Sequence, residues 1–218
     1  MKTLVVVPAY NEATTIESVL QALQGMHDVV VIDDGSTDDT GARARACGVR
    51  VLSHVVNRGL GAALRTGFAY ALRVGEYDAV VTLDADGQHD PHDIPRVLAG
   101  LSGGSDVVIG ARVRSHMPPI RQAYNMIGGV ISAGLFGGPM IDAQSGFRAF
   151  KIAKLREMNL TTSRMEISSE IVAEAHRIGA RIVEVPISVR YTTYSLSKGQ
   201  SFLEGVRTLW RLVLKSLN

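Results

Sequence analysis

Residues 81–88 read Val-Thr-Leu-Asp-Ala-Asp-Gly-Gln, so an apolar run ends in two carboxylates one residue apart. Side chains alternate along an extended backbone, and Asp84 and Asp86 are therefore expected on one side of the strand's carboxyl end. Hard oxygen ligands placed in this way suit a Mg²⁺ or Mn²⁺ ion that bridges phosphate oxygens. The pair indicates a nucleotide diphosphate bound through a metal. For the isolated pattern the alternative is a solvated strand end that enters a turn.

Two other apolar runs also end in polar clusters, Tyr10-Asn11-Glu12 and Asp33-Asp34-Gly35-Ser36. Open α/β sheets bind ligands outside the carboxyl ends of their strands, so parallel strands would gather all three clusters at one edge. Glu12, and either Asp33 or Asp34, could accept hydrogen bonds from a base or a ribose. The alternatives are a first-turn helix acid for Glu12 and an Asp-Gly turn followed by a capped helix.

Residues 57–61, Asn-Arg-Gly-Leu-Gly, open a predicted helix, where backbone N–H groups and the Arg58 cation would favour an anion. A phosphate-binding P-loop is excluded because no Gly-Lys-Ser/Thr follows Gly61. The third glycine of a dinucleotide-binding fingerprint would fall at Leu64, which disfavours a nicotinamide-dependent dehydrogenase.

The elements that must position these groups alternate between strand and helix in the first two-thirds of the chain. Apolar runs predict strands over residues 4–8, 29–33, 49–53, 79–84 and 106–110. Helical spacing predicts helices over residues 14–23, from the end of Gly-Ser-Thr (35–37) to residue 46, over 59–74 and over 93–101. Strands this apolar are covered on both faces, so we expect an α/β fold with a mostly parallel sheet flanked by helices.

Composition sets limits on the class of protein. The chain has 218 residues, 46% of them hydrophobic, and a net charge of +2, which fits a folded globule and excludes a general nucleic-acid binder. One cysteine rules out an internal disulfide framework. The start of the chain has no signal-peptide pattern, and no uncharged apolar stretch reaches the roughly 20 residues of a spanning helix. We therefore expect a cytoplasmic location.

Four motifs together resemble those of the family-two glycosyltransferases with the GT-A fold. They are Val-Pro-Ala-Tyr-Asn-Glu at 7–12, Asp-Asp-Gly-Ser-Thr-Asp at 33–38, Asn-Arg-Gly-Leu-Gly at 57–61 and Asp-Ala-Asp-Gly-Gln at 84–88. Gly-Ala-Arg at 110–112 and Asp-Ala-Gln-Ser-Gly-Phe-Arg at 142–148 are similar to the dolichyl-phosphate mannose synthase and polyprenyl-phosphate glycosyltransferase branch. The resemblance implies a catalytic domain over 1–200, with a nucleotide-sugar half (1–112) and an acceptor half (113–200).

The resemblance assigns roles to the matching positions. The nucleotide-sugar site would be formed by Pro8, Tyr10, Glu12, Asp33, Asp34, Arg58 and Asp84. The divalent ion, Mg²⁺ or Mn²⁺, and the diphosphate would be held by Asp84, Asp86 and Gln88. The acceptor phosphate would be surrounded by Arg112, Arg121, Asn125, Arg148, Arg190 and Lys198. Leu60 occupies a position where many mannose synthases carry Lys, so GDP-mannose and UDP-glucose both stay open as donors.

The chemistry of a lipid-phosphate acceptor explains this choice of residues. Phosphate monoesters have a second pKa of about 6, so the acceptor is already an anion that can attack without a strong base. The site must then position it and neutralise charge. The resemblance gives this catalytic task to Asp86, Arg112, Arg121 and Arg148 in an inverting hexosyl transfer.

The end of the chain, residues 201–218, is predicted to be an amphipathic helix. Its apolar positions include Trp210, and Arg207, Arg211 and Lys215 recur every four residues, a pattern that suits a membrane interface. The alternative is a helix packed on the sheet. We expect a protein at the cytoplasmic face of a membrane, attached directly or through a separate membrane-protein partner.

Two other functions are compatible with these motifs. A transferase of the same family could act on a glycan or glycolipid hydroxyl, and would then need a carboxylate base. A noncatalytic nucleotide-sugar-binding module is the alternative of another class. Such a module would be expected to lack Asp86 or Arg148, and this chain has both.

Overall fold

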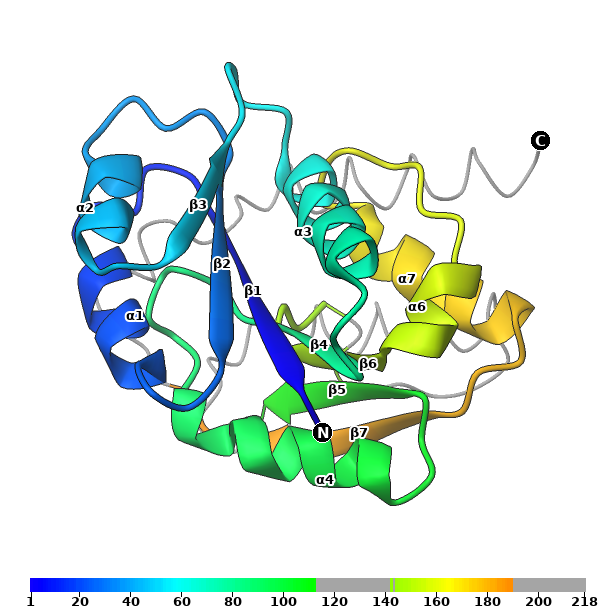
Figure 1. Ribbon diagram of the computed structural model, residues 1–218. Coiled ribbons are helices and arrows are strands. Elements are labelled where there is room, and N and C mark those ends of the chain that lie inside the picture. The colour runs from blue at the N-terminus through cyan, green and yellow to red at the C-terminus, as the bar shows by residue number, and fades with distance from the viewer. Residues whose placement is uncertain (113–141, 143, 190–218) are drawn as a thin grey trace, which may run out of the picture.

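The computed structural model describes residues 1–112, 142 and 144–189 (Figure 1). The strands are β1 Thr3–Ala9, β2 Asp28–Asp33, β3 Arg50–Ser53, β4 Ala79–Thr82, β5 Val107–Arg112, β6 Arg148–Lys151 and β7 Ile182–Ile187. The helices are α1 Ile16–Leu23, α2 Thr40–Ala46, α3 Leu60–Val74, the 3₁₀ turn η1 Pro91–Asp93, α4 Ile94–Ser102, α6 Ile152–Glu157 and α7 Ile167–Arg177.

The strands form one sheet in the order β3-β2-β1-β4-β6-β5-β7. Neighbouring strands run parallel except β6, which is antiparallel to both β4 and β5. The carboxyl ends of the parallel strands therefore meet the amino end of β6 at one edge of the sheet. The expected mostly parallel α/β sheet is confirmed.

Helices cover both faces of the sheet (Figure 1). Along β1, Val5 and Val7 pack with buried side chains of α1, α2 and α4. Leu4 and Val6 point the other way and pack with α3, α6 and α7. This alternation with a period of two explains why β1 is apolar at every position.

Three local predictions differ from the structure. The helix after β2 begins only at Thr40, because the preceding residues form a turn bound to the loop after β1. Strand β4 ends at Thr82, two residues short of the predicted strand end. The short helix α6 was not anticipated.

Several predicted features lie outside the described residues. They are Arg121, Asn125, Arg190, Lys198 and the helix over 201–218. The division into a catalytic domain and a terminal helix thus stays a prediction. In the part of the chain that the structure describes, no helix is long and apolar enough to cross a membrane.

Candidate active site

The predicted polar clusters share the carboxyl edge of the sheet. The loops that follow β1, β2 and β4 leave the sheet there, as the parallel pairing requires. Arg112 ends β5 at the same edge. Arg148 begins antiparallel β6 and pairs with Thr82 on one side and Ile109 on the other, which places an arginine beside the end of β4.

Asp84 and Asp86 are brought together by a turn rather than by an extended strand. Buried Leu83 and Ala85 anchor the segment in the core, and Gly87 then adopts a positive φ of 73°. The Asp86 carboxylate accepts a hydrogen bond from the Gln88 backbone N–H (2.9 Å) and another from the Gln88 side-chain amide. This turn therefore holds the side chains of two predicted metal-binding residues, Asp86 and Gln88, against each other.

The Asp84 carboxylate lies against the backbone of Gly146. A Cβ at that position would overlap both carboxylate oxygens, so a larger residue there would displace the Asp84 side chain. Thr82 fixes this approach because its hydroxyl donates to the Gly146 carbonyl (2.7 Å). The Ser-Gly-Phe-Arg segment is therefore built around Asp84.

Both acidic side chains have raised pKa values. Burial raises the pKa of Asp84, and Glu12 adds to the rise, while Arg112 and Arg148 oppose it. Burial also raises the pKa of Asp86, and the nearby Asp84 charge raises it further. The repulsion between the two carboxylates would be relieved by a cation bound beside them.

The donor set fits a divalent ion of the hard, oxygen-preferring kind. Asp84 and Asp86 offer carboxylate oxygens, and Gln88 carries an amide beside them. Within residues 1–112, 142 and 144–189 there is no group of three or more His, Cys, Asp or Glu side chains arranged to hold a metal. A cation here would therefore need further oxygen ligands from outside that set, for which diphosphate oxygens are suitable.

Arg112 is clamped onto a buried carboxylate. Its Nε lies 2.6 Å from Asp142 Oδ2 and its Nη2 lies 2.7 Å from Oδ1, while its backbone N–H donates to the same carboxylate. The Asp142 N–H in turn donates to Glu184 of β7 (2.7 Å). This two-point fork fixes the plane of the Arg112 guanidinium.

Arg148 lies beneath the site rather than on its surface. It is only 2% exposed, and burial lowers the pKa of its guanidinium to about 10, with Asp84 and Asp142 acting in the opposite direction. Its position suits the balancing of buried negative charge. The predicted contact with an acceptor phosphate stays a prediction, and it would require Arg148 to become accessible.

The loops after β1 and β2 are bound to each other through side chains that the motifs supply. The backbone N–H groups of Asn11 and Glu12 donate to Ser36 Oγ (3.0 Å) and Thr40 Oγ1 (2.7 Å). Asn11 has a positive φ of 54°, which Asn tolerates, and its amide oxygen accepts from the Thr37 N–H. Glu12 stands at the start of α1 and close enough to Asp84 to affect its pKa.

The carboxylates of Asp33 and Asp34 accept hydrogen bonds from backbone N–H groups of neighbouring loops. Asp33 accepts from the Ser36 N–H (3.1 Å), as expected for the turn alternative. Asp34, which is 3% exposed, accepts from the N–H groups of Arg58 (3.0 Å) and Gly59 (2.7 Å), and His54 Nδ1 lies 2.6 Å from it. Contact of either carboxylate with a nucleoside remains a prediction.

The amino end of α3 is closed by protein, which alters the expectation of an anion site there. The Gly59 N–H is bound to Asp34, and the Ala62 N–H donates to the Ser163 carbonyl (3.0 Å). A Cβ on Gly59 or Gly61 would press on backbone oxygens of the 162–163 segment. The two glycines therefore permit close packing, whereas Asn57 and Arg58, just before them, are exposed.

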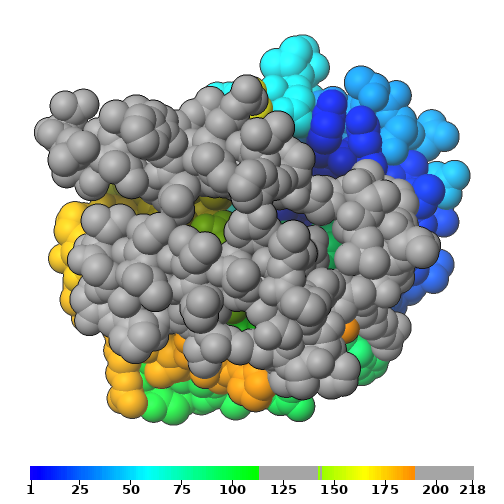
Figure 2. Space-filling view, turned by 180° about the vertical axis from the view of Figure 1, so that it is seen from behind, coloured from blue at the N-terminus to red at the C-terminus, as the bar shows by residue number. Residues whose placement is uncertain are grey.

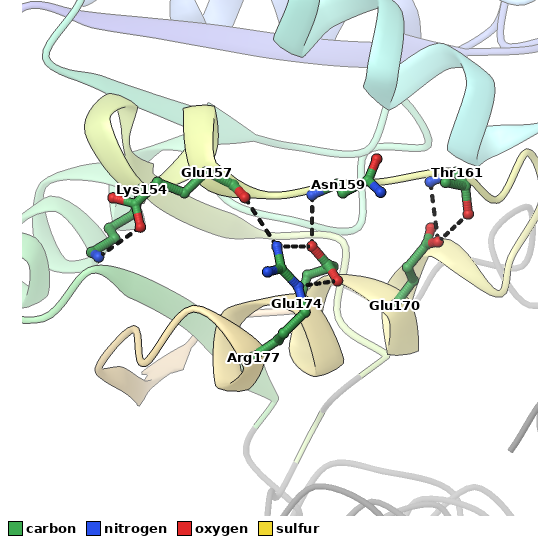
Figure 3. A network of polar contacts seen from close by, with 7 residues as sticks. All are labelled: Lys154, Glu157, Asn159, Thr161, Glu170, Glu174 and Arg177. Atoms are coloured by element: carbon green, nitrogen blue, oxygen red, sulfur yellow. Dashed lines mark hydrogen bonds and ion pairs between the residues drawn. The ribbon is translucent and has the colours of Figure 1, made fainter.

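The segment that closes α3 is fixed by two acidic residues of α7 (Figure 3). Glu170 accepts hydrogen bonds from the backbone and hydroxyl groups of both Thr161 and Thr162, at 2.6–3.0 Å. Glu174 accepts from the Asn159 N–H (2.6 Å) and pairs with Arg177. These contacts connect α7 to the 159–162 segment, and the adjoining 162–163 backbone packs on Gly59 and Gly61 at the start of α3.

The remaining predicted residues differ in accessibility. Pro8 is buried within β1, whereas Tyr10 is 44% exposed at the edge. One neighbour was missed: His89 is buried against Phe147, and its Nδ1 lies 3.7 Å from Asp84 Oδ2. Burial lowers the pKa of His89 to about 4, so the ring is neutral near pH 7. Its place three residues after Asp86 was the signal available in the sequence.

The fold and the acidic edge define a glycosyltransferase of the GT-A type, and comparison with known proteins agrees. Residues 4–157 match the family described as Glycosyl transferase family 2. The chain therefore belongs to the family 2 glycosyltransferases.

Two relatives and one solved structure illustrate the similarity. A UDP-N-acetylglucosamine–dolichyl-phosphate N-acetylglucosaminyltransferase of Methanococcus voltae is 32% identical, over 96% of this chain and 94% of its own. An undecaprenyl-phosphate mannosyltransferase of Micrococcus luteus is 33% identical, over 86% and 83%. Glucosyl-3-phosphoglycerate synthase of Mycobacterium tuberculosis, in complex with Mn²⁺ and UDP-glucose, gives a TM-score of 0.77 at 26% identity, over 97% and 76%.

Proposed function

We propose that this protein transfers a hexose, with inversion, from a nucleoside diphosphate sugar to a polyprenyl or dolichyl phosphate. The observation that carries the proposal is the Asp84–Asp86 pair at the carboxyl edge, with Arg112 ending the next parallel strand and Arg148 beneath. The names of the two relatives support a polyprenyl-phosphate acceptor. The two relatives transfer different sugars, so their names do not identify the donor. We propose GDP-mannose as the first choice and UDP-glucose as the second.

The residues of the site divide the electrostatic work. Asp84, Asp86 and Gln88 would hold Mg²⁺ or Mn²⁺, which supplies charge neutralisation for the departing diphosphate. Arg148 balances the negative charges of the buried Asp142 and the partly exposed Asp84. Arg112, held in its plane by Asp142, orients an incoming phosphate at the mouth of the site. An anionic acceptor needs no proton removed, so the site requires no dedicated base.

The acceptor also determines where the reaction occurs. Its prenyl chain lies in a bilayer, so we propose that the carboxyl edge of the sheet works at a membrane surface. The predicted helix over 201–218 and a separate membrane-protein partner remain proposals for the means of attachment.

The direct test is a transfer assay with the purified full chain. Radiolabelled GDP-mannose, UDP-glucose and UDP-N-acetylglucosamine are each offered with a polyprenyl phosphate or with phosphoglyceric acid. Label that enters the organic phase only with the lipid phosphate supports the proposal. Transfer to phosphoglyceric acid but not to the lipid phosphate would contradict the proposal and indicate a soluble acceptor.

A further inference from the structure

The loop between β3 and α3 presents two adjacent valines to solvent. Val55 is 99% exposed and Val56 is 64% exposed. Among the residues that the structure describes, the other exposed large hydrophobic side chains are those of Met1, Tyr10 and Met26. Single exposed apolar residues are common on protein surfaces, so the pair is informative only if its setting is unusual.

The backbone of this loop is held from several sides. Arg58 and Gly59, which follow the two valines in the chain, donate their N–H groups to the buried Asp34 carboxylate. His54, which precedes the two valines, is hydrogen-bonded to Asp34 and to Thr66 of α3 (2.9 Å). A Cβ on Gly35 would overlap the backbone of Val56. The two valines are thus exposed on a firmly anchored backbone, rather than at the end of a loosely attached one.

The tip lies at the functional edge of the molecule. It follows the carboxyl end of β3, whereas Met26 precedes β2 and so lies at the opposite edge. Figure 1 shows the loop projecting beyond the end of the sheet, and Figure 2 shows the same cyan segment at the top of the molecule from behind. The edge that carries Asp84 is therefore also the one from which the valines project.

We propose that Val55 and Val56 form a tip that enters the headgroup region of the bilayer when the enzyme works. The inference rests on the proposed function, because a lipid-bound acceptor requires this edge to approach a membrane. Two side chains are far too few for a stable protein interface, which takes roughly 20–30 residues a side. They are enough to anchor an edge that other contacts bring to the surface, and the exposed Arg58 beside them complements anionic headgroups.

The test compares vesicle binding of three full-length proteins: the parent, the double variant Val55→Ser/Val56→Ser and the control Met26→Ser. Vesicles of phosphatidylglycerol and phosphatidylcholine are sedimented, and the bound fraction is measured against lipid concentration. Loss of the two apolar side chains from the interface is expected to raise the lipid concentration for half binding about tenfold. Met26→Ser is expected to bind like the parent because Met26 lies at the other edge.

A second readout separates membrane contact from damage to the site. With a short-chain polyprenyl phosphate in solution, the double variant is expected to turn over at the parent rate; with a long-chain acceptor in vesicles, its rate is expected to fall. Equal vesicle binding by all three proteins would contradict the proposed membrane contact of Val55 and Val56 while leaving the proposed function intact. If no lipid phosphate is a substrate but the double variant still binds vesicles less well, the proposed function is wrong and the membrane contact of the two valines is supported.

Discussion

The carboxylate of Asp84 lies where the side chain of any other residue at position 146 would begin, although Asp84 and Gly146 are 62 positions apart in the chain. The contact joins the segment after β4 to the segment that leads into β6. It explains why the acidic motif and the Ser-Gly-Phe-Arg motif occur in one sequence: each needs the other for its position.

Gly146→Ala should therefore displace Asp84. The added methyl group overlaps both carboxylate oxygens, and a misplacement of about 1 Å at a reacting centre can lower the rate about 100-fold. Gly103→Ala is the matched control, because a Cβ there meets nothing closer than 3.5 Å. Steady-state transfer rates check this, and a Gly146→Ala enzyme as active as the control would show that the Asp84 position is unimportant.

Asp142→Asn should destabilise the protein strongly. The variant removes the charge that pairs with Arg112 and faces Arg148, and breaking a buried ion pair costs about 3–5 kcal/mol. Glu157→Gln, which breaks the exposed pair with Lys154, should change stability by about 0–1 kcal/mol. Urea unfolding of both variants decides the matter, since similar losses would mean that the Arg112 fork contributes no more than a surface pair.

The Glu170 clamp should make part of the stability depend on pH. Burial raises the pKa of Glu170, but the hydrogen bonds from Thr161 and Thr162 outweigh it and bring the pKa below its ordinary value of 4.5. The carboxylate is thus favoured in the folded state, and its contribution is complete above pH 4.5 and lost as the pH falls through the lowered value. The stability difference between the parent and Glu170→Gln should shrink on acidification; a constant difference from pH 7 to pH 3 would contradict this.

His54→Ala should loosen the loop that Asp34 organises. Without the ring, Asp34 loses the partner at 2.6 Å, and the N–H groups of Arg58 and Gly59 should exchange with solvent at least about tenfold faster. The KM for the nucleotide sugar should rise more than kcat falls, because the loop adjoins the predicted nucleoside pocket. Hydrogen exchange indistinguishable from that of the parent would assign His54 no positioning role.

The sequence was sufficient for the arrangement of the sheet edge but not for the orientation of its side chains. Asp84, Asp86 and Glu12 could be placed together because parallel strands end at a common edge, and that rule depends on the apolar runs alone. The roles of Asp34 and Arg148 could not be predicted, because their burial depends on partners far away in the chain. Gly59 and Gly61 show the same limit, since the oxygens they approach belong to the 162–163 segment.

The measurement that tests the central claim most directly is the rate of label transfer from nucleotide sugar to polyprenyl phosphate by the parent, Asp86→Asn and Asp90→Asn, with Mg²⁺ or Mn²⁺ and with EDTA. Asp90 is the matched control because its carboxylate caps η1, a role that Asn can keep. We predict that EDTA abolishes transfer, that Asp86→Asn lowers it at least about 100-fold and that Asp90→Asn retains it. Full transfer by Asp86→Asn, or in EDTA, would contradict a cation held at the Asp84–Asp86 edge.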